Sequence, residues 1–90
     1  MTASVPRVYN KRRAGIPVDA VYVGRPTKWG NPFVVGVHGT REEVIERYEH
    51  WIQKNRELMV ALHELRGKDL VCWCAPLPCH ADVLVRLANV

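Results

Sequence analysis

Three cysteines and a histidine are crowded into residues 72–80, the segment whose side chains offer the most chemistry. Thiol and imidazole groups can bind zinc, act as nucleophile and base, or hold an anionic ligand. In a strand, residues two apart share a face, so Cys72 and Cys74 are expected to point the same way. Cys79 and His80 then fall in the first turn of a following helix, where free N–H groups favour a thiolate or a bound anion.

The sequence leaves four interpretations of this cluster open. The first interpretation is a zinc site with Cys74, Cys79 and His80 as ligands, and with Cys72 or His38 as the fourth. The spacing of these residues matches no common zinc finger. A reactive thiolate at Cys79 or Cys74 with His80 as base is another, so Cys79 and His80 are the candidate catalytic residues. His80 and backbone N–H groups could instead hold an anion non-covalently. The cysteines could also only pack, which is our expectation for Cys72, the deepest in its strand.

A second informative stretch is the loop of residues 24–33, which Pro26 and Pro32 stiffen. Arginine can grip a phosphate bidentately, lysine adds a point charge, and tryptophan can stack on a base. This composition suits a nucleotide better than an inorganic ion, with a purely structural turn as the alternative. Together with Cys74 and His80, the predicted ligand-binding residues are Arg25 and Lys28 for the anion, Thr27, Trp29 for stacking, and Asn31 for polar specificity.

The elements that would position these residues alternate between strands and helices. Strands are predicted where β-branched and aromatic residues lie between turn residues, at 7–10, 20–24, 33–37 and 69–74. A helix is predicted from Thr40, because Thr40 and Glu43 can form a capping box ahead of an apolar stripe. Further helical stretches are predicted at 57–66 and 79–89.

This order predicts one small α/β domain over residues 1–90, with a Rossmann-like layout of three to four strands in one sheet flanked by helices. Residues 69–74 are apolar on both faces and read as a buried strand. Ligands of open α/β sheets bind outside the carboxyl ends of the strands. Since both informative stretches follow predicted strands, we expect them to line one shared hollow.

The composition is that of a globular protein: 48% of the 90 residues are hydrophobic and 24% are charged. No apolar run approaches the roughly 18 residues of a membrane span, and the N-terminus lacks an apolar signal segment. An odd number of cysteines, all between residues 72 and 79, fits a reducing compartment better than a disulfide scaffold. We therefore expect a cytoplasmic protein with no membrane partner.

The net charge of +4 is concentrated near the N-terminus. Residues 1–30 carry six basic side chains and one acidic one, whereas residues 31–90 carry seven basic and eight acidic ones. This excess suggests an anionic partner, either a phosphate on a small molecule or a nucleic-acid backbone, and a solvated basic tail is the alternative. We expect residues 1–18 to form a basic segment that is partly mobile.

Four short motifs carry a family resemblance: Val21–Pro26, Trp29–Phe33, Cys72–Cys74 and Cys79–Leu84. Through them the chain resembles, over nearly its whole length, the bacterial and phage family called domain of unknown function 4326. The resemblance implies a phage or bacterial origin, hence a host cytoplasm if phage-encoded, and it transfers no catalytic role. A weaker similarity to domain of unknown function 488, where an arginine stands in the place of Ala81, supports only the Rossmann-like layout.

The leading functional expectation is binding, with processing left open, of a small phosphate-bearing or nucleotide-like ligand at the strand ends. One alternative is a nucleic-acid-binding accessory protein that uses Arg7, Lys11, Arg12 and Arg13. Another is a zinc-stabilised module that docks on a host factor. The sequence does not decide whether a reaction is catalysed, and its thin core is compatible with a homodimer.

Overall fold

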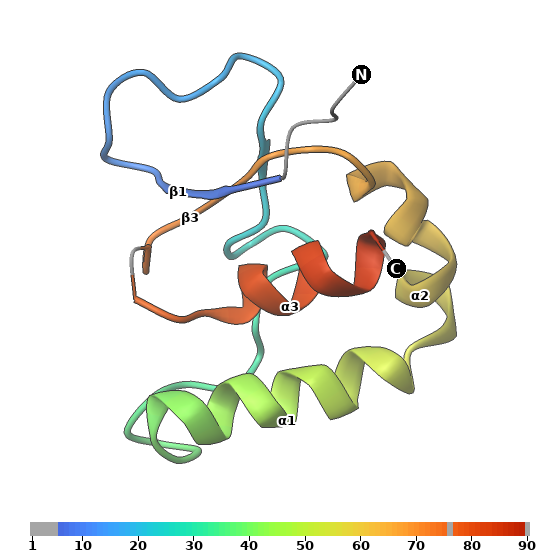
Figure 1. Cartoon of the computed structure of the whole chain (residues 1–90). Coiled ribbons are helices and arrows are strands. Elements are labelled where there is room, and N and C mark those ends of the chain that lie inside the picture. Colours follow the sequence, from blue (N-terminus) through green and yellow to red (C-terminus); the bar gives the residue numbers. More distant parts are fainter. Residues whose placement is uncertain (1–5, 76, 90) are drawn as a thin grey trace.

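The computed structural model describes residues 6–75 and 77–89, so residues 1–5 of the expected basic segment lie outside the described residues. The chain forms a mixed α/β structure, as expected (Figure 1). In chain order its elements are β1 (Val8–Asn10), β2 (Val21–Tyr22), α1 (Arg41–Gln53), α2 (Arg56–Ala61), the 3-10 helix η1 (Leu62–Leu65), β3 (Leu70–Cys72) and α3 (His80–Ala88).

The three strands form one parallel sheet in the order β1-β3-β2. Val71 of the central strand is paired with Tyr9 on one side and Tyr22 on the other. All three residues of β3 are buried, which confirms the strand expected from its continuous apolar run. Because the strands are parallel, their carboxyl ends meet at the same edge of the sheet.

The helices lie on one side of this sheet, with α3 between the strands and α1 (Figure 1). Leu70 and Cys72 of β3, Leu84 of α3, and Tyr48 and Ile52 of α1 are fully buried in a common core. In the described part of the chain, α3 makes the main helix contacts with β1 and β3. Among the residues that the structure describes, helices on both faces of the sheet, which a Rossmann-like layout would require, are therefore not seen.

Local capping fixes where the helices begin. The predicted capping box is present: Thr40 Oγ1 accepts a hydrogen bond from the Glu43 amide, and Glu43 Oε1 accepts one from the Thr40 amide at 2.8 Å. These bonds to Thr40 hold the pKa of the Glu43 carboxyl below its usual value. The Asn55 side chain caps a new helix by accepting from the Leu58 amide, so the predicted 57–66 stretch is α2 followed by η1.

The predicted strand at residues 33–37 is wrong. This segment is a series of turns, closed by bonds from the Val37 and His38 amides to the Val34 carbonyl. Gly36 has a φ of 86°, a left-handed conformation that interrupts an extended strand. Among the described residues, none of the helices is long and apolar enough to span a membrane.

Candidate functional site

A pocket of about 320 Å³ lies where β2 and β3 end and α3 begins. The structure brings the two informative stretches together in it, as the parallel topology requires. The loop after β2 contributes Arg25, Asn31 and Phe33, and the segment from β3 to α3 contributes Cys72, Cys74, Cys79 and His80. The first turns of α1 complete the wall with Arg41, Val44 and Ile45.

Two thiols meet on this wall. The Sγ atoms of Cys72 and Cys79 lie 3.0 Å apart, and both cysteines are free and buried. Cys72 ends β3 and Cys79 is the N-cap of α3, so the contact joins the central strand to the helix that follows it. The prediction that Cys72 only packs captures its burial but misses this pairing and its place on the pocket wall.

The two thiols are electrostatically unequal. A hydrogen bond from the Cys79 thiol lowers the pKa of Cys72, and the backbone amides of Cys74 and Ala75 lower it further. The same contact, followed by burial, raises the pKa of Cys79. These directions make Cys72 the more acidic thiol of the pair, with Cys79 as its hydrogen-bond donor.

His80 is held as a neutral ring. Its Nε2 lies 2.8 Å from the Val23 carbonyl oxygen, which can only accept, so Nε2 carries the proton. Burial, the largest influence, lowers the pKa of the ring. The ring also packs edge-on against Tyr48, with centroids 5.1 Å apart. His80 therefore lines the pocket as an uncharged group, with Nδ1 as its only nitrogen available for accepting a proton.

Arg25 both closes its loop and faces the pocket. Its Nε donates to the Asn31 carbonyl at 2.8 Å and its Nη2 donates to the Phe33 carbonyl at 3.3 Å. The Asn31 side chain is buried and also serves the loop, accepting from the Phe33 amide and donating to the Val44 carbonyl. Gly30 allows this closure, since a Cβ there would lie 3.0 Å from Arg25 Cγ.

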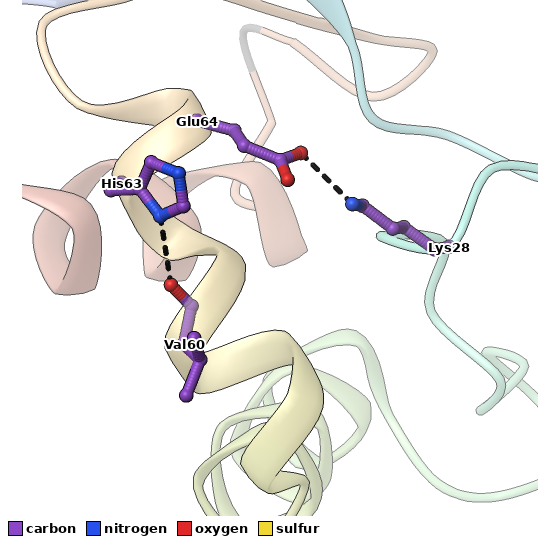
Figure 2. Close-up of polar contacts among 4 residues, drawn as sticks. All are labelled: Lys28, Val60, His63 and Glu64. Atoms are coloured by element: carbon purple, nitrogen blue, oxygen red, sulfur yellow. Dashed lines mark hydrogen bonds and ion pairs between the residues drawn. The ribbon is translucent and has the colours of Figure 1, made fainter.

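Three of the predicted ligand-binding residues do not line this pocket. Thr27 Oγ1 donates to the Gly24 carbonyl within the loop at 2.6 Å. Lys28 forms an ion pair with Glu64 of η1 at 2.9 Å, beside the His63 ring that contacts the Val60 carbonyl (Figure 2).

Trp29 is the third predicted ligand-binding residue outside the pocket, and its position agrees with the alternative that this loop is a purely structural turn. Its side chain is only 3% exposed and belongs to the core, so it is not presented to a ligand. The buried Tyr48 hydroxyl donates to the Trp29 carbonyl at 2.7 Å, which ties the loop to α1. The pKa of the Tyr48 phenol is raised, mainly because the group is buried.

Arg41 is a pocket residue that the sequence interpretation missed. It lies in the first turn of α1 and donates from Nη1 to the Pro78 carbonyl at 3.2 Å. A cation at this position opposes the positive end of the helix dipole. A basic residue in the first turn of a helix is therefore the sequence signal that could have identified Arg41 as a candidate binding residue.

The zinc prediction is not supported by the geometry. Within residues 6–75 and 77–89, the structure contains no group of three His, Cys, Asp or Glu side chains that could hold a metal ion. In the predicted set of Cys74, Cys79 and His80, the His80 Nε2 is already hydrogen-bonded to the Val23 carbonyl. The Cys79 thiol is already hydrogen-bonded to that of Cys72.

Comparison with known proteins agrees with the motifs. An "uncharacterized 12.4 kDa protein in nrdA-td intergenic region" of Enterobacteria phage T4 is 38% identical over 87 residues, covering 92% of this chain and 77% of that protein. "Uncharacterized protein R718" of Acanthamoeba polyphaga mimivirus is 32% identical over 85 residues, covering 74% of this chain and 65% of that protein. No solved structure matches the chain. Residues 7–90 match one family, and the chain therefore belongs to the family described as "Domain of unknown function (DUF4326)".

Proposed function

We propose that this protein binds a small phosphate-bearing, nucleotide-like ligand in the pocket at the carboxyl ends of β2 and β3. The observation that carries the proposal is that two arginines, Arg25 and Arg41, line the same pocket as the Cys72–Cys79 pair. Small-ligand sites usually enclose about 300–1,000 Å³. A volume near 320 Å³ therefore favours a single nucleotide or sugar phosphate over a dinucleotide.

The arginines are suited to phosphate because each is already oriented. Arg25 is fixed through Nε and Nη2, and Arg41 through Nη1, all to backbone carbonyls. A guanidinium has five N–H donors, so each arginine keeps others for an anion. Less side-chain freedom is then lost on binding, which supports affinity.

The charge distribution suggests the direction in which the ligand lies. A thiolate at Cys72 would repel a phosphate, whereas the two guanidinium groups attract it. Phe33, Val44 and Ile45 supply apolar wall for an uncharged ring. We therefore expect the phosphate to lie against Arg25 and Arg41 and away from Cys72, with the uncharged ring against these apolar side chains.

Thermal shift with a ligand panel tests the proposal: nucleoside monophosphates, sugar phosphates, inorganic phosphate and unphosphorylated nucleosides. A ligand at a hundred times its Kd should stabilise the fold by about 2.7 kcal/mol. Arg41→Gln should weaken its binding by at least about tenfold, the cost of one charged hydrogen bond. Arg47→Gln, an exposed change on the same helix, should not.

Two results would overturn the proposal. One is a panel in which no phosphorylated compound stabilises the wild type. The other is equal binding by the Arg41→Gln and Arg47→Gln proteins, since a charge that lines the pocket would then contribute nothing to binding.

A further inference from the structure

We infer that the sheet face opposite α3, remote from the helices, is a binding surface for single-stranded nucleic acid. The side chains that form this cation–aromatic face are Tyr9, Tyr22, Trp73, Lys11, Arg12 and Arg13. The face is a different surface from the interior of the pocket, although Tyr22 and Trp73 border both.

The aromatic side chains share a face because of strand register. Tyr9 and Tyr22 both pair with Val71, so these three residues project to the same side of the sheet. Trp73 follows Val71 by two residues and continues the row toward the carboxyl ends. Val71 lies outside the main core cluster, whereas its neighbours Leu70 and Cys72 belong to it. The row is therefore on the side that the helices leave uncovered (Figure 1).

A cation lies over each ring. Lys11 Nζ is 4.2 Å from the Tyr22 ring centroid, Arg12 Cζ is 5.3 Å from that of Trp73, and Arg13 Cζ is 5.6 Å from that of Tyr9. Across the described residues the ion pairs are Lys28–Glu64 and Arg86–Glu49 alone, so none of these three cations is neutralised by a carboxylate. The face thus concentrates positive charge over one exposed tryptophan and two half-buried tyrosines.

Hydrogen bonds hold the face in shape. The Asn10 side-chain amide donates to the Trp73 and Ala75 carbonyls, both at 2.9 Å, and its oxygen accepts from the Arg12 amide. The Trp73 indole donates to the Tyr22 hydroxyl at 2.9 Å, and that hydroxyl donates to the Arg25 carbonyl. Trp73 is nevertheless 48% exposed, so a large hydrophobic ring is fixed in position and open to solvent.

These features fit a single strand better than other anions. Single-stranded nucleic acid combines phosphates, which the cations attract, with unpaired bases, which stack on aromatic rings. In a duplex the bases are hidden in the stack, and an acidic peptide would use the cations without needing an ordered tryptophan. The rings and the charges together point to the single strand.

Fluorescence anisotropy tests the inference, with a labelled mixed-sequence DNA single strand of about ten nucleotides, within the usual site size. Three phosphate contacts predict a log–log salt slope of about −2. Replacing Lys11, Arg12 and Arg13 by Ala should abolish most of the binding and flatten this slope. The control replaces Lys54, Arg66 and Lys68, three exposed cations elsewhere, and should change affinity less than about threefold.

A second pair of variants tests stacking. Trp73→Leu should weaken binding about tenfold, whereas Trp73→Phe should stay close to wild type because it keeps an aromatic ring. If the triple variant does not fold, as judged by circular dichroism, the three single alanine variants replace it, and each should weaken binding.

The inference fails if the control triple weakens binding as much as the face triple, because net charge alone would then explain it. It also fails if Trp73→Leu binds like wild type, or if duplex DNA, a poly-glutamate peptide or anionic vesicles bind the face more tightly than the single strand. The phosphate-pocket variant Arg41→Gln should leave single-strand binding unchanged, so the two proposals can fail separately.

Discussion

The sulfur atoms of Cys72 and Cys79 lie 3.0 Å apart, across the junction between the central strand and the helix that follows it. When Cys72 loses its proton, this contact becomes a hydrogen bond from the Cys79 thiol to the Cys72 thiolate, and that bond lowers the pKa of Cys72. It also brings together the two groups that a disulfide would join.

We expect mild oxidation with hydrogen peroxide to link this pair. The two thiols would give up two electrons and two protons to the peroxide, forming one S–S bond and two water molecules. Intact mass and peptide mapping should show the loss of two hydrogen atoms between Cys72 and Cys79, with Cys74 still open to alkylation. Cys72→Ser should abolish the linkage and Cys74→Ser should not. A disulfide that involves Cys74 in the wild type would contradict the geometry.

The inequality of the two thiols has a measurable consequence for pH. An ordinary cysteine titrates near pH 8.5, and the Cys79 hydrogen bond should move the titration of Cys72 below that value. Cys79→Ala removes the donor and should return the midpoint of Cys72 toward the ordinary range. Ultraviolet thiolate absorbance, read as a function of pH in a Cys74→Ser background, follows the change. Equal midpoints with and without Cys79 would show that the donor has no effect on the thiolate.

His80 should make the fold sensitive to mild acid. Its pKa is lowered in the folded state, so the unfolded chain binds the proton more readily, near pH 6.5. The stabilisation is therefore complete above that pH and is lost as the pH falls through the lower, folded-state pKa. Urea unfolding at several pH values between about 7.5 and 5 should show the free energy of unfolding decreasing with acidity.

His80→Gln is the matched variant, because its amide can still donate to the Val23 carbonyl but does not titrate. It should reduce the pH dependence, whereas His63→Gln, at an exposed position, should not. Parallel curves for the wild type and His80→Gln would rule out His80 as the group responsible.

Tyr48→Phe should measure how firmly the loop of residues 24–33 is tied to α1. The change removes the hydroxyl that donates to the Trp29 carbonyl at 2.7 Å and leaves a buried acceptor unpaired. Such a loss costs about 1–3 kcal/mol in the free energy of unfolding, which denaturant titration resolves. Tyr9→Phe, on the open face of the sheet, should cost less than about 0.5 kcal/mol. Similar costs at both positions would mean that the buried bond contributes nothing specific.

Local sequence signals were sufficient for much of the fold. The Thr40–Glu43 capping box is a contact between near neighbours, so α1 could be located from it. The apolar run around Val71 predicted a buried strand because burial on both faces leaves a pattern in the residues themselves. The convergence of the two informative stretches also followed from sequence, since strands joined by helical crossovers are parallel and end at one edge.

The tertiary structure decided which way side chains point where the backbone has no period. In the loop after β2, nothing local separates a Trp29 that stacks on a ligand from one that enters the core, and in the structure Trp29 belongs to the core together with Tyr48 and Ile52 of α1. Lys28 forms its ion pair with Glu64, which is far away in the sequence. Residues 33–37 form turns instead of a strand, with Gly36 in a left-handed conformation. The pairing of Cys72 with Cys79 likewise depends on how α3 docks against β3. Periodic patterns report which face of an element is buried, but the partners of an irregular segment are set only when distant parts of the chain pack together.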